Sequence, residues 1–281
     1  MNAQLLVKST SGVNLTPKGE DLADRLLGVD QALFAMQSDL QAETKETEGT
    51  VRVTCTEALT GLFIVPALKS FNAIYPRVHL HTRNPINLLS FRENLSDIMV
   101  GFGPLNQPGL VSKPSGYLHL IAIVAHSYAE QHGVPTRANL AAHHFIDAEY
   151  YASNTPAYSS WRSAVALGTV AHQIDNPFAY AMMVKAGGGI GLLSNFTLAD
   201  RDVFPVDIGS HVRLPIFIHA LEDRLQSKPV RVVYDWLAEL FSPANPWFSD
   251  ELRTDAYPPR IAEDAFERIT VGTRLAHPAS Q

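Results

Sequence analysis

The sequence predicts an α/β fold preceded by a long helix, and three observations lead to this prediction. Short apolar segments with strand character alternate with helical segments after residue 49. The connections between these segments are short, which is typical of strand–helix–strand units with a mostly parallel sheet. Before them, apolar residues recur at spacings of 4 and 3 residues, as on a helix that packs against another helix. These residues are Leu22, Leu26, Val29, Leu33, Met36 and Leu40.

This first helix has a well-defined start. The hydroxyl of Thr16 can accept a hydrogen bond from an amide of the first turn, and Pro17 suits the first helical position. Two interpretations stay open, because the apolar seam fits a helix that pairs with a second copy and equally an amphipathic helix that lies on its own domain.

Composition restricts the class of protein. The 281 residues, 46% of them hydrophobic, suit a soluble globular chain with room for two lobes. The net charge of −6 argues against a surface that binds polyanions all over the molecule. The single cysteine, Cys55, excludes an internal disulfide and fits a reducing compartment. The chain lacks an apolar run of about 18 residues and a signal-peptide pattern, so we expect a cytoplasmic protein without a membrane partner.

Five elements open the α/β region. We expect strands at 51–55, 78–83 and 97–102, separated by helices at about 59–74 and 87–93. In the second half we expect strands at 120–126, 145–151, 170–174, 189–194 and 215–221, with helices at about 161–167, 177–185 and 229–241. The proline-containing tail, 244–281, is expected to be loosely ordered.

Four segments carry a family resemblance. They are GVNLTPKGE at 12–20, GTVRVTCTEALTGLFIVPALKSFNAIYP at 49–76, FRENLSDIMVGFG at 91–103 and VKAGGGIGLLS at 184–194. Each motif is weak alone, but their order and spacing are specific. Over residues 5–243 the chain resembles the LysR-type transcriptional regulators.

The resemblance implies a two-lobed, periplasmic-binding-protein-like domain that binds a small-molecule effector between its lobes. It implies no cofactor. The implied division is a winged helix-turn-helix remnant at 1–20, a linker and dimerisation helix at 21–48, and an effector-binding domain at 49–243. Within that domain, lobe I covers 49–119 and 219–243, and lobe II covers 120–218.

The DNA-binding part is expected to be incomplete. A full family member carries roughly 50 more residues, which hold the helices that enter the major groove. We expect a mis-set start or a truncated reading frame rather than a natural regulator without those helices. Lys8, Ser9 and Lys18 remain as candidate contacts to the phosphates of double-stranded DNA, which position a protein without reading sequence.

Ligands of α/β domains bind beyond the carboxyl ends of strands, where helix starts offer free amides. Applied to the expected strands, this rule selects the candidate effector-binding residues Thr56, Glu57, Thr60, Asn84, Gly103, Asp147, Asn176 and Phe178.

Several of these candidates have plainer interpretations. Thr56 and Thr60 also suit helix capping, and Asn176 before Pro177 also suits an ordinary helix start. Glu57 either turns outward to solvent or faces the ligand. In the second case it would repel a carboxylate ligand by about 1–4 kcal/mol, so the effector would be neutral or carry an amine.

Enzyme-like features are discounted. His79 and His81 lie on one face of a strand but lack an acidic or cysteine partner nearby in the sequence, so no metal site is expected. His143 and His144 are expected to be solvated. The glycines at 187–191 follow a helix rather than a strand, so we expect a tight turn instead of a phosphate loop. Cys55 suits a buried structural thiol better than a redox sensor.

Three classes of function follow. The leading one is an effector-responsive transcription regulator that acts on DNA as dimers or tetramers. The alternative is a freestanding cytoplasmic module that binds a small ligand without recognising DNA directly. An enzyme ranks third, because the sequence has no Ser-His-Asp order and no Gly-x-Ser-x-Gly motif.

Overall fold

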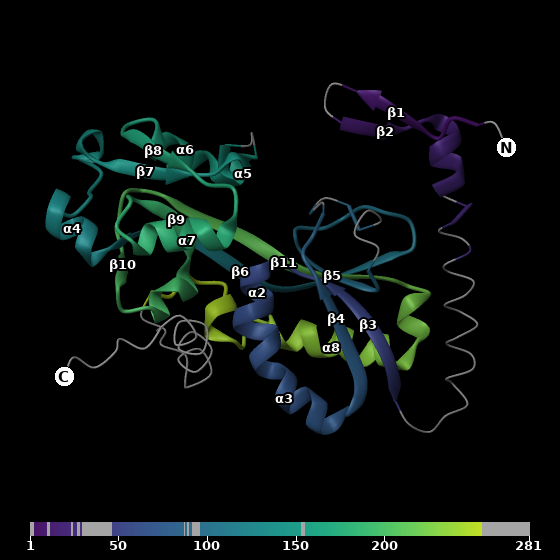
Figure 1. Cartoon of the computed structure of the whole chain (residues 1–281). Helices are drawn as coiled ribbons and strands as arrows, with labels where there is room; N and C mark the ends of the chain where they lie inside the picture. The colour runs from purple at the N-terminus through teal and green to yellow at the C-terminus, as the bar shows by residue number, and fades with distance from the viewer. Residues whose placement is uncertain are drawn as a thin grey trace, which may run out of the picture.

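The computed structural model describes residues 3–9, 12–23, 25–26, 29, 47–86, 88, 90–91, 96–152 and 155–254. A seven-stranded sheet joins the two lobes, with strand order β10-β6-β11-β5-β3-β4 and with β9 paired to β6. The two-lobed α/β fold that the resemblance implied is therefore present (Figure 1).

Lobe I is built on three parallel strands. β3 (Glu48–Thr54) lies between β4 (Arg77–Arg83) and β5 (Ile98–Phe102). From β3 to β4 the chain forms three consecutive helical pieces, α2 (Glu57–Leu59), the π-helical η1 (Thr60–Ile64) and α3 (Val65–Ile74). The helix predicted at 59–74 is thus confirmed, with an earlier start and a π-helical turn.

Two long strands connect the lobes. β6 (Leu110–Ala125) and β11 (His211–Leu221) run antiparallel, and their register shifts between Pro215 and Phe217. β11 also pairs antiparallel with β5, and β6 pairs antiparallel with β9 (Gly191–Ser194) and β10 (Val203–Pro205). The expectation of a mostly parallel sheet is wrong, because the strands that cross between the lobes run in opposite directions.

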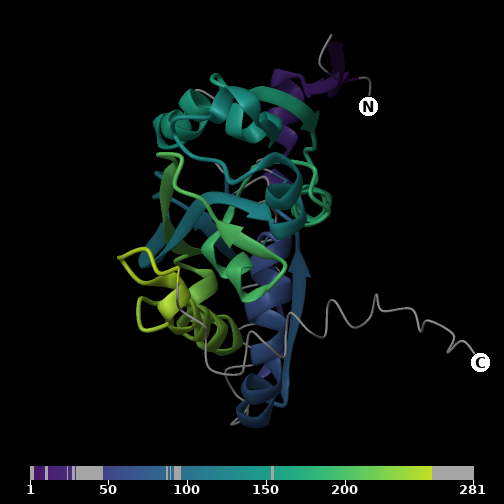
Figure 2. The same cartoon turned by 90° about the vertical axis from the view of Figure 1, so that its left-hand side faces the viewer.

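Lobe II carries most of the remaining elements. They are α4 (His126–His132), η3 (Leu140–Ala142), β7 (His144–Asp147), α5 (Glu149–Ala152), η4 (Pro156–Tyr158), α6 (Ser159–Val165), β8 (Thr169–Gln173), α7 (Pro177–Lys185) and η5 (Asn195–Ala199). α7 has the predicted bounds. The strand predicted at 145–151 is too long, since α5 begins at Glu149. Figure 2 shows the teal helices of lobe II above the sheet.

The chain returns to lobe I through η6 (Arg224–Gln226) and α8 (Lys228–Leu240). α8 packs on β3 and β11 and buries Val230, Val233 and Leu237. The expected loose order after residue 244 is wrong for the segment that follows α8, because η7 (Pro246–Phe248) inserts Trp247 and Phe248 into the core. Residues 255–281 lie outside the described part of the chain.

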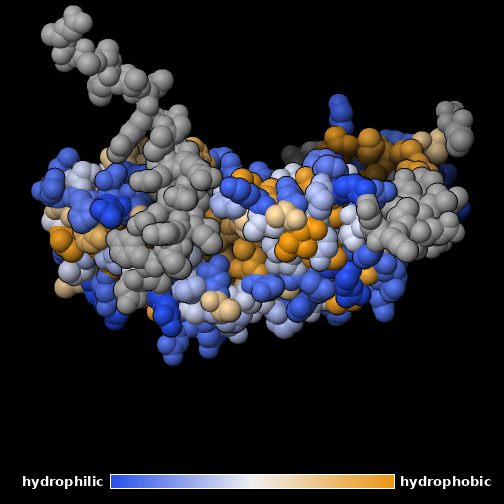
Figure 3. Space-filling model, turned by 90° about the horizontal axis from the view of Figure 1, so that it is seen from below, coloured by the Kyte–Doolittle hydropathy of each residue, from blue (hydrophilic) through white to orange (hydrophobic). Residues whose placement is uncertain are grey.

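The N-terminal hairpin stands beside lobe I. β1 (Leu6–Ser9) pairs antiparallel with β2 (Gly12–Leu15), and a helix follows from Pro17. The predicted cap is confirmed, because the Gly19 amide donates to the Thr16 hydroxyl at 3.1 Å. Figure 3 shows apolar residues at the right-hand end of the molecule, where the hairpin lies in Figure 1. The exposed apolar side chains of the hairpin are Leu6, Val7, Val13 and Leu15.

Two other predictions fall largely outside the described residues. In the linker helix, Leu22, Leu26 and Val29 are exposed, and Leu33, Met36 and Leu40 are not described. Of the helix predicted at 87–93, only residues 88, 90 and 91 are described, and they are not helical. None of the helices in the described part of the chain is long and apolar enough to cross a membrane.

Candidate functional site

The turn after β3 supplies the first group of candidate residues. Thr56 directly precedes α2, but its side chain makes no capping hydrogen bond, so capping does not account for it. Glu57 is exposed in the first turn of α2. The Thr60 hydroxyl oxygen is buried without a hydrogen-bond partner among the described residues, although it lies beside the Cys55 thiol. Burial raises the pKa of Cys55 to about 12, which fits the predicted buried thiol.

Two further lobe I candidates lie at the same ends of the neighbouring strands. The Cys55 amide donates to the Arg83 carbonyl at 3.0 Å, which brings the exposed Asn84 next to the Thr56 turn. Gly103 follows β5 with a φ of 112°. A left-handed φ of this kind favours glycine, so the backbone turns sharply at the end of β5.

A histidine that the sequence prediction missed lies beneath this edge. His219 on β11 is fully buried, and its Nδ1 lies 2.8 Å from the Ser112 hydroxyl. Burial lowers the pKa of His219 to about 4, so its imidazole is neutral near pH 7. Its other ring nitrogen faces Gly101, where an added Cβ would lie 3.0 Å away. The signal in the sequence was one polar residue inside the apolar run PIFIHAL.

Lobe II contributes two carboxylates. Asp147, at the end of β7, accepts a hydrogen bond from the Trp161 indole at 2.9 Å. Asp175, which sequence reasoning also missed, accepts from the Glu149 amide at 2.6 Å. The two lie on adjacent segments, since the Ile174 amide donates to the Asp147 carbonyl at 2.9 Å.

The start of α7 provides an amide and an aromatic ring. The Asn176 side-chain oxygen accepts from the Ala179 amide at 2.8 Å, so this residue is the helix cap that its plainer interpretation predicted. Phe178 is 50% exposed. Nearby, burial raises the pKa of Tyr150 to about 12, and the negative charges of Asp175 and Asp147 add to that increase.

α2 of lobe I lies against α7 of lobe II, so Glu57 and Phe178 lie on helices that contact each other. Glu57, Asp147 and Asp175 form no ion pair within the described part of the chain. Asp147 and Asp175 act electrostatically on Tyr150, and two carboxylates near an aromatic ring have the chemistry to hold a cation or a neutral polar molecule.

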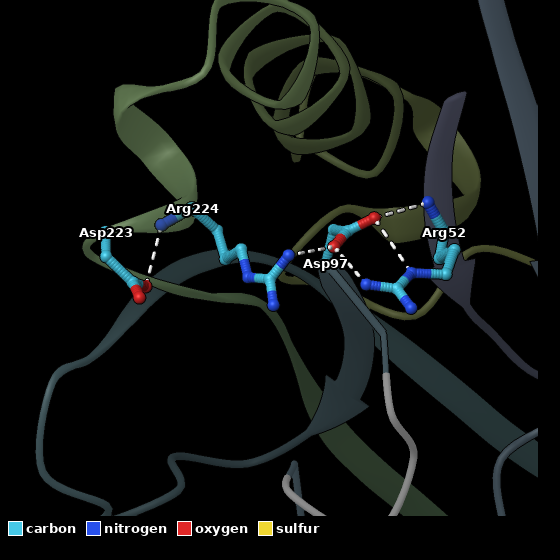
Figure 4. A network of polar contacts seen from close by, with 4 residues as sticks. All are labelled: Arg52, Asp97, Asp223 and Arg224. Atoms are coloured by element: carbon cyan, nitrogen blue, oxygen red, sulfur yellow. Dashed lines mark hydrogen bonds and ion pairs between the residues drawn. The ribbon is translucent and has the colours of Figure 1, made fainter. Parts of the chain in front are cut away.

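A different carboxylate of lobe I is fully occupied. Asp97, just before β5, is buried, and its oxygens accept from the Arg52 amide at 2.8 Å and from the Arg52 guanidinium at 3.1 and 3.3 Å (Figure 4). The buried Arg224 of η6 donates to the same carboxylate at 3.4 Å. This network joins β3, β5 and the entry to α8, so its role is structural.

The histidines in the described part of the chain assemble no metal site. His79 and His81 are exposed on the edge strand β4. Nowhere in the described ranges do three His, Cys, Asp or Glu side chains lie together as metal ligands would. The expectation that His143 is solvated is wrong, because it is buried against the Tyr128 hydroxyl at 3.2 Å; its neighbour His144 is exposed. Burial lowers the pKa of His143.

The candidate phosphate contacts lie on and beside the hairpin. Lys8 is exposed on β1 and Lys18 in the first helical turn, while Ser9 ends β1. The glycines after α7 form the predicted turn into β9, with Gly187 at a φ of 81° and Gly189 at 150°.

Comparison with known proteins decides the family. Residues 44–242 match the model of the LysR substrate binding domain. The chain belongs to the LysR family of transcriptional regulators. Two sequence relatives are YhjC of Escherichia coli (strain K12), 22% identical over 146 residues, and CrgA of Neisseria meningitidis, 23% identical over 210 residues. These matches cover 52% and 72% of this LysR chain, and 49% and 68% of the relatives.

Solved LysR structures confirm the fold. CrgA from Neisseria meningitidis superposes with a TM-score of 0.58 at 19% identity and covers 84% of this chain and 83% of that one. Full-length AphB from Vibrio cholerae gives 0.55 at 18% identity with the same coverage. The effector domain of AmpR from Pseudomonas aeruginosa gives 0.55 at 19% identity, covering 68% of this chain and 95% of that one.

Proposed function

We propose that this LysR-family chain acts in a DNA-binding transcription regulator whose two lobes bind a small-molecule effector between them. The observation that carries the proposal is the contact of α2 from lobe I with α7 from lobe II. Both helices begin beyond strand ends, where ligands of α/β domains bind. An effector that touches both helices favours one arrangement of the lobes, and this preference changes how attached DNA-binding parts are held.

The effector, we propose, is neutral or carries an amine rather than a carboxylate. Glu57, Asp147 and Asp175 lack ion-pair partners among the described residues, and we propose that their charges act on a ligand bound near the starts of α2 and α7. An anionic ligand would be repelled by about 1–4 kcal/mol for each close carboxylate. An ammonium group would be attracted, and the exposed rings of Tyr150 and Phe178 would add cation–π contacts of about 0.5–2 kcal/mol.

Calorimetry with two probes of similar size and opposite charge tests this proposal. We expect 2-phenylethylamine to bind more tightly than 3-phenylpropanoate, and Glu57→Gln to weaken the amine about 5- to 10-fold, in line with 1–1.4 kcal/mol for one screened charge. Glu130→Gln, on the exposed face of α4, is the matched control. Tighter binding of the carboxylate, or no effect of Glu57→Gln on the amine, would refute the proposed effector class.

Self-association and DNA contact complete the proposed function. Leu22, Leu26 and Val29 expose apolar surface on one helix, which supports pairing with a second copy in dimers or tetramers. Lys8, Ser9 and Lys18 lie at the hairpin, where we propose that they contact phosphates of double-stranded DNA.

Sedimentation of a Leu26→Asp variant separates this function from the alternative of a freestanding ligand-binding module. If the apolar side chains of this helix pair two chains, the aspartate introduced at position 26 would be buried between them and would shift the protein toward monomer. Glu20→Gln on the same helix should leave the sedimenting mass unchanged. A module that does not use this helix to associate would sediment alike with and without the Leu26→Asp change.

A further inference from the structure

The segment after α8 crosses between the lobes. It comprises residues 246–254, which we call the strap. On the lobe I side its Phe248 ring lies 4.7 Å from the Phe63 ring of η1 and 5.1 Å from the Phe241 ring that follows α8. Figure 1 shows this yellow-green segment beside β6. The strap is therefore anchored in the lobe I core by aromatic packing.

The strap then passes over the two strands that join the lobes. At Gly116 of β6 an added Cβ would lie 2.4 Å from the Phe248 carbonyl oxygen, so only glycine allows this close approach. Beyond it, the Ser249 carbonyl meets His119 of β6, with 2.9 Å between the oxygen and Nε2. Asp250 forms an ion pair with Arg213 of β11.

The far end of the strap reaches lobe II. The Asn195 side chain of η5 donates to the Arg253 carbonyl at 3.3 Å. The strap thus holds lobe I, both crossing strands and lobe II with one continuous stretch of chain. A change in the angle between the lobes must stretch or release at least one of these contacts.

A pair of histidines lies at the centre of these contacts. Nδ1 of the buried His119 is 2.9 Å from Nε2 of the exposed His211, and the planes of the two rings lie 18° apart. His119 must donate from Nε2, because its partner there is the Ser249 carbonyl oxygen, which only accepts. One proton therefore lies between the rings, and the neutral pair satisfies the whole chain of hydrogen bonds.

Proton counting shows what acid does to this pair. One added proton can be accommodated on the outer nitrogen of His211, because a single N–H still points from one ring to the other. A second proton places two N–H donors face to face, and the contact is lost. The two rings can therefore stay hydrogen-bonded to each other at a net charge of zero or +1, but not at +2.

The charged surroundings also disfavour the protonated pair. Arg213 on β11 is the cation beside both rings; its guanidinium stacks 3.6 Å from the Tyr117 ring centroid and pairs with Asp250 of the strap. α6 contributes the Ser160 hydroxyl, which donates to the His211 carbonyl at 3.4 Å. From η4, which packs against β11, comes Tyr158, whose pKa burial raises, so it stays neutral.

Both imidazoles have pKa values below the ordinary value of 6.5. Burial is the main cause at His119, where the Arg213 charge adds to it. At His211 burial is again the main cause, followed by the charges of His119 and Arg213. Proton uptake is thus more favourable once the pair has separated, and acid favours separation.

We propose that the strap is a hinge restraint and that the His119–His211 pair is its latch, which opens when both imidazoles are protonated. When the strap is open, it no longer restrains the movement of lobe II relative to lobe I about β6 and β11. This inference does not rest on the identity of the effector, and its test requires no ligand.

Hydrogen exchange of the full chain at pH 7.5 and pH 5.0, corrected for the intrinsic exchange rate, measures the latch directly. We expect protection of the Trp247 and Phe248 amides, which both donate to Asn245, to fall about 30-fold, because the open strap binds one proton more than the latched strap and a free imidazole titrates near 6.5. The amides of β3 serve as an internal reference. A fall of less than about threefold, or an equal fall in β3, would overturn the proposal.

Two variants and a control locate the effect. A glutamine at 211 can either donate to or accept from His119, so His211→Gln should keep the strap protected at both pH values. His211→Phe retains an aromatic ring but has no hydrogen-bond donor, so it should lower protection already at pH 7.5. His79→Gln on the exposed edge of β4 should behave like the unmodified chain. A pH response of His211→Gln equal to that of the unmodified chain would assign the effect to another group and refute the latch.

Discussion

Asp97 and Glu57 are carboxylates of the same lobe, and the fold treats them in opposite ways. Asp97 is buried and receives hydrogen bonds from Arg52 and Arg224, so its charge is fully compensated inside lobe I. Glu57 is exposed at the start of α2 and has no ion pair among the described residues. The contrast separates a buried charge that holds the fold together from a charge that is exposed to solvent.

Removing the buried Asp97 carboxylate should have the largest effect on the free energy of unfolding. Asp97→Ala removes the buried carboxylate that Arg52 and the buried Arg224 share, and loss of one partner of a buried ion pair costs about 3–5 kcal/mol. Urea unfolding measures this change in the free energy of unfolding. The matched control is Asp21→Ala, whose exposed pair with Arg25 should contribute about 0.5 kcal/mol or less. Similar costs for the two variants would show that Asp97 is not the structural charge described here.

A second prediction concerns acid and His219, a buried histidine of lobe I. Its pKa of about 4 lies below the unfolded value, so the folded state binds fewer protons in acid. Above pH 6.5 this histidine does not lower the free energy of unfolding. As the pH falls from 6.5 toward 4, the free energy of unfolding decreases by about 3 kcal/mol in total. The free energy of unfolding of His219→Gln, measured by denaturant unfolding at each pH, should therefore fall by about 3 kcal/mol less in acid than that of the unmodified chain. Parallel pH profiles for the variant and the unmodified chain would contradict this.

The uncompensated carboxylate should matter least to stability. Glu57→Gln removes an exposed charge without an ion-pair partner in the described chain, so the free energy of unfolding should change by less than about 0.5 kcal/mol. Thermal unfolding in the absence of ligand checks this expectation. A loss above about 1 kcal/mol would mean that Glu57 is a structural residue, and the contrast with Asp97 would disappear.

The elements that the sequence predicted well are those whose signals are local. α7 begins at an asparagine cap with a proline in its first turn, and its predicted bounds of 177–185 agree with the structure. The strands β3, β4 and β5 are short apolar or alternating runs between clear breaks. The two-lobed arrangement itself depended on the family resemblance, because pairing between distant strands leaves no local signal.

Long-range packing defeated the other predictions. The first half of β6 contains Pro114 and Gly116, which ordinarily interrupt strands, yet its partner β11 keeps it extended. Trp247 lies in a proline-containing tail, and only the distant surface that it contacts makes the segment ordered. At the candidate site, strand ends were predictable from topology, whereas Asp175 and His219 depended on neighbours that the sequence does not reveal.

The hydrogen bond from the Trp161 indole to Asp147 gives the protein an optical property. Indole emission responds to the electric field of a nearby carboxylate, and Trp161 is one of only three tryptophans in the chain. The other two, Trp236 beside Phe71 and Trp247 in the strap, lie in different surroundings. Replacing both by phenylalanine would leave a single tryptophan, hydrogen-bonded to a proposed ligand-binding residue. Binding of a ligand at Asp147 would then shift the wavelength of the intrinsic fluorescence, with no attached dye.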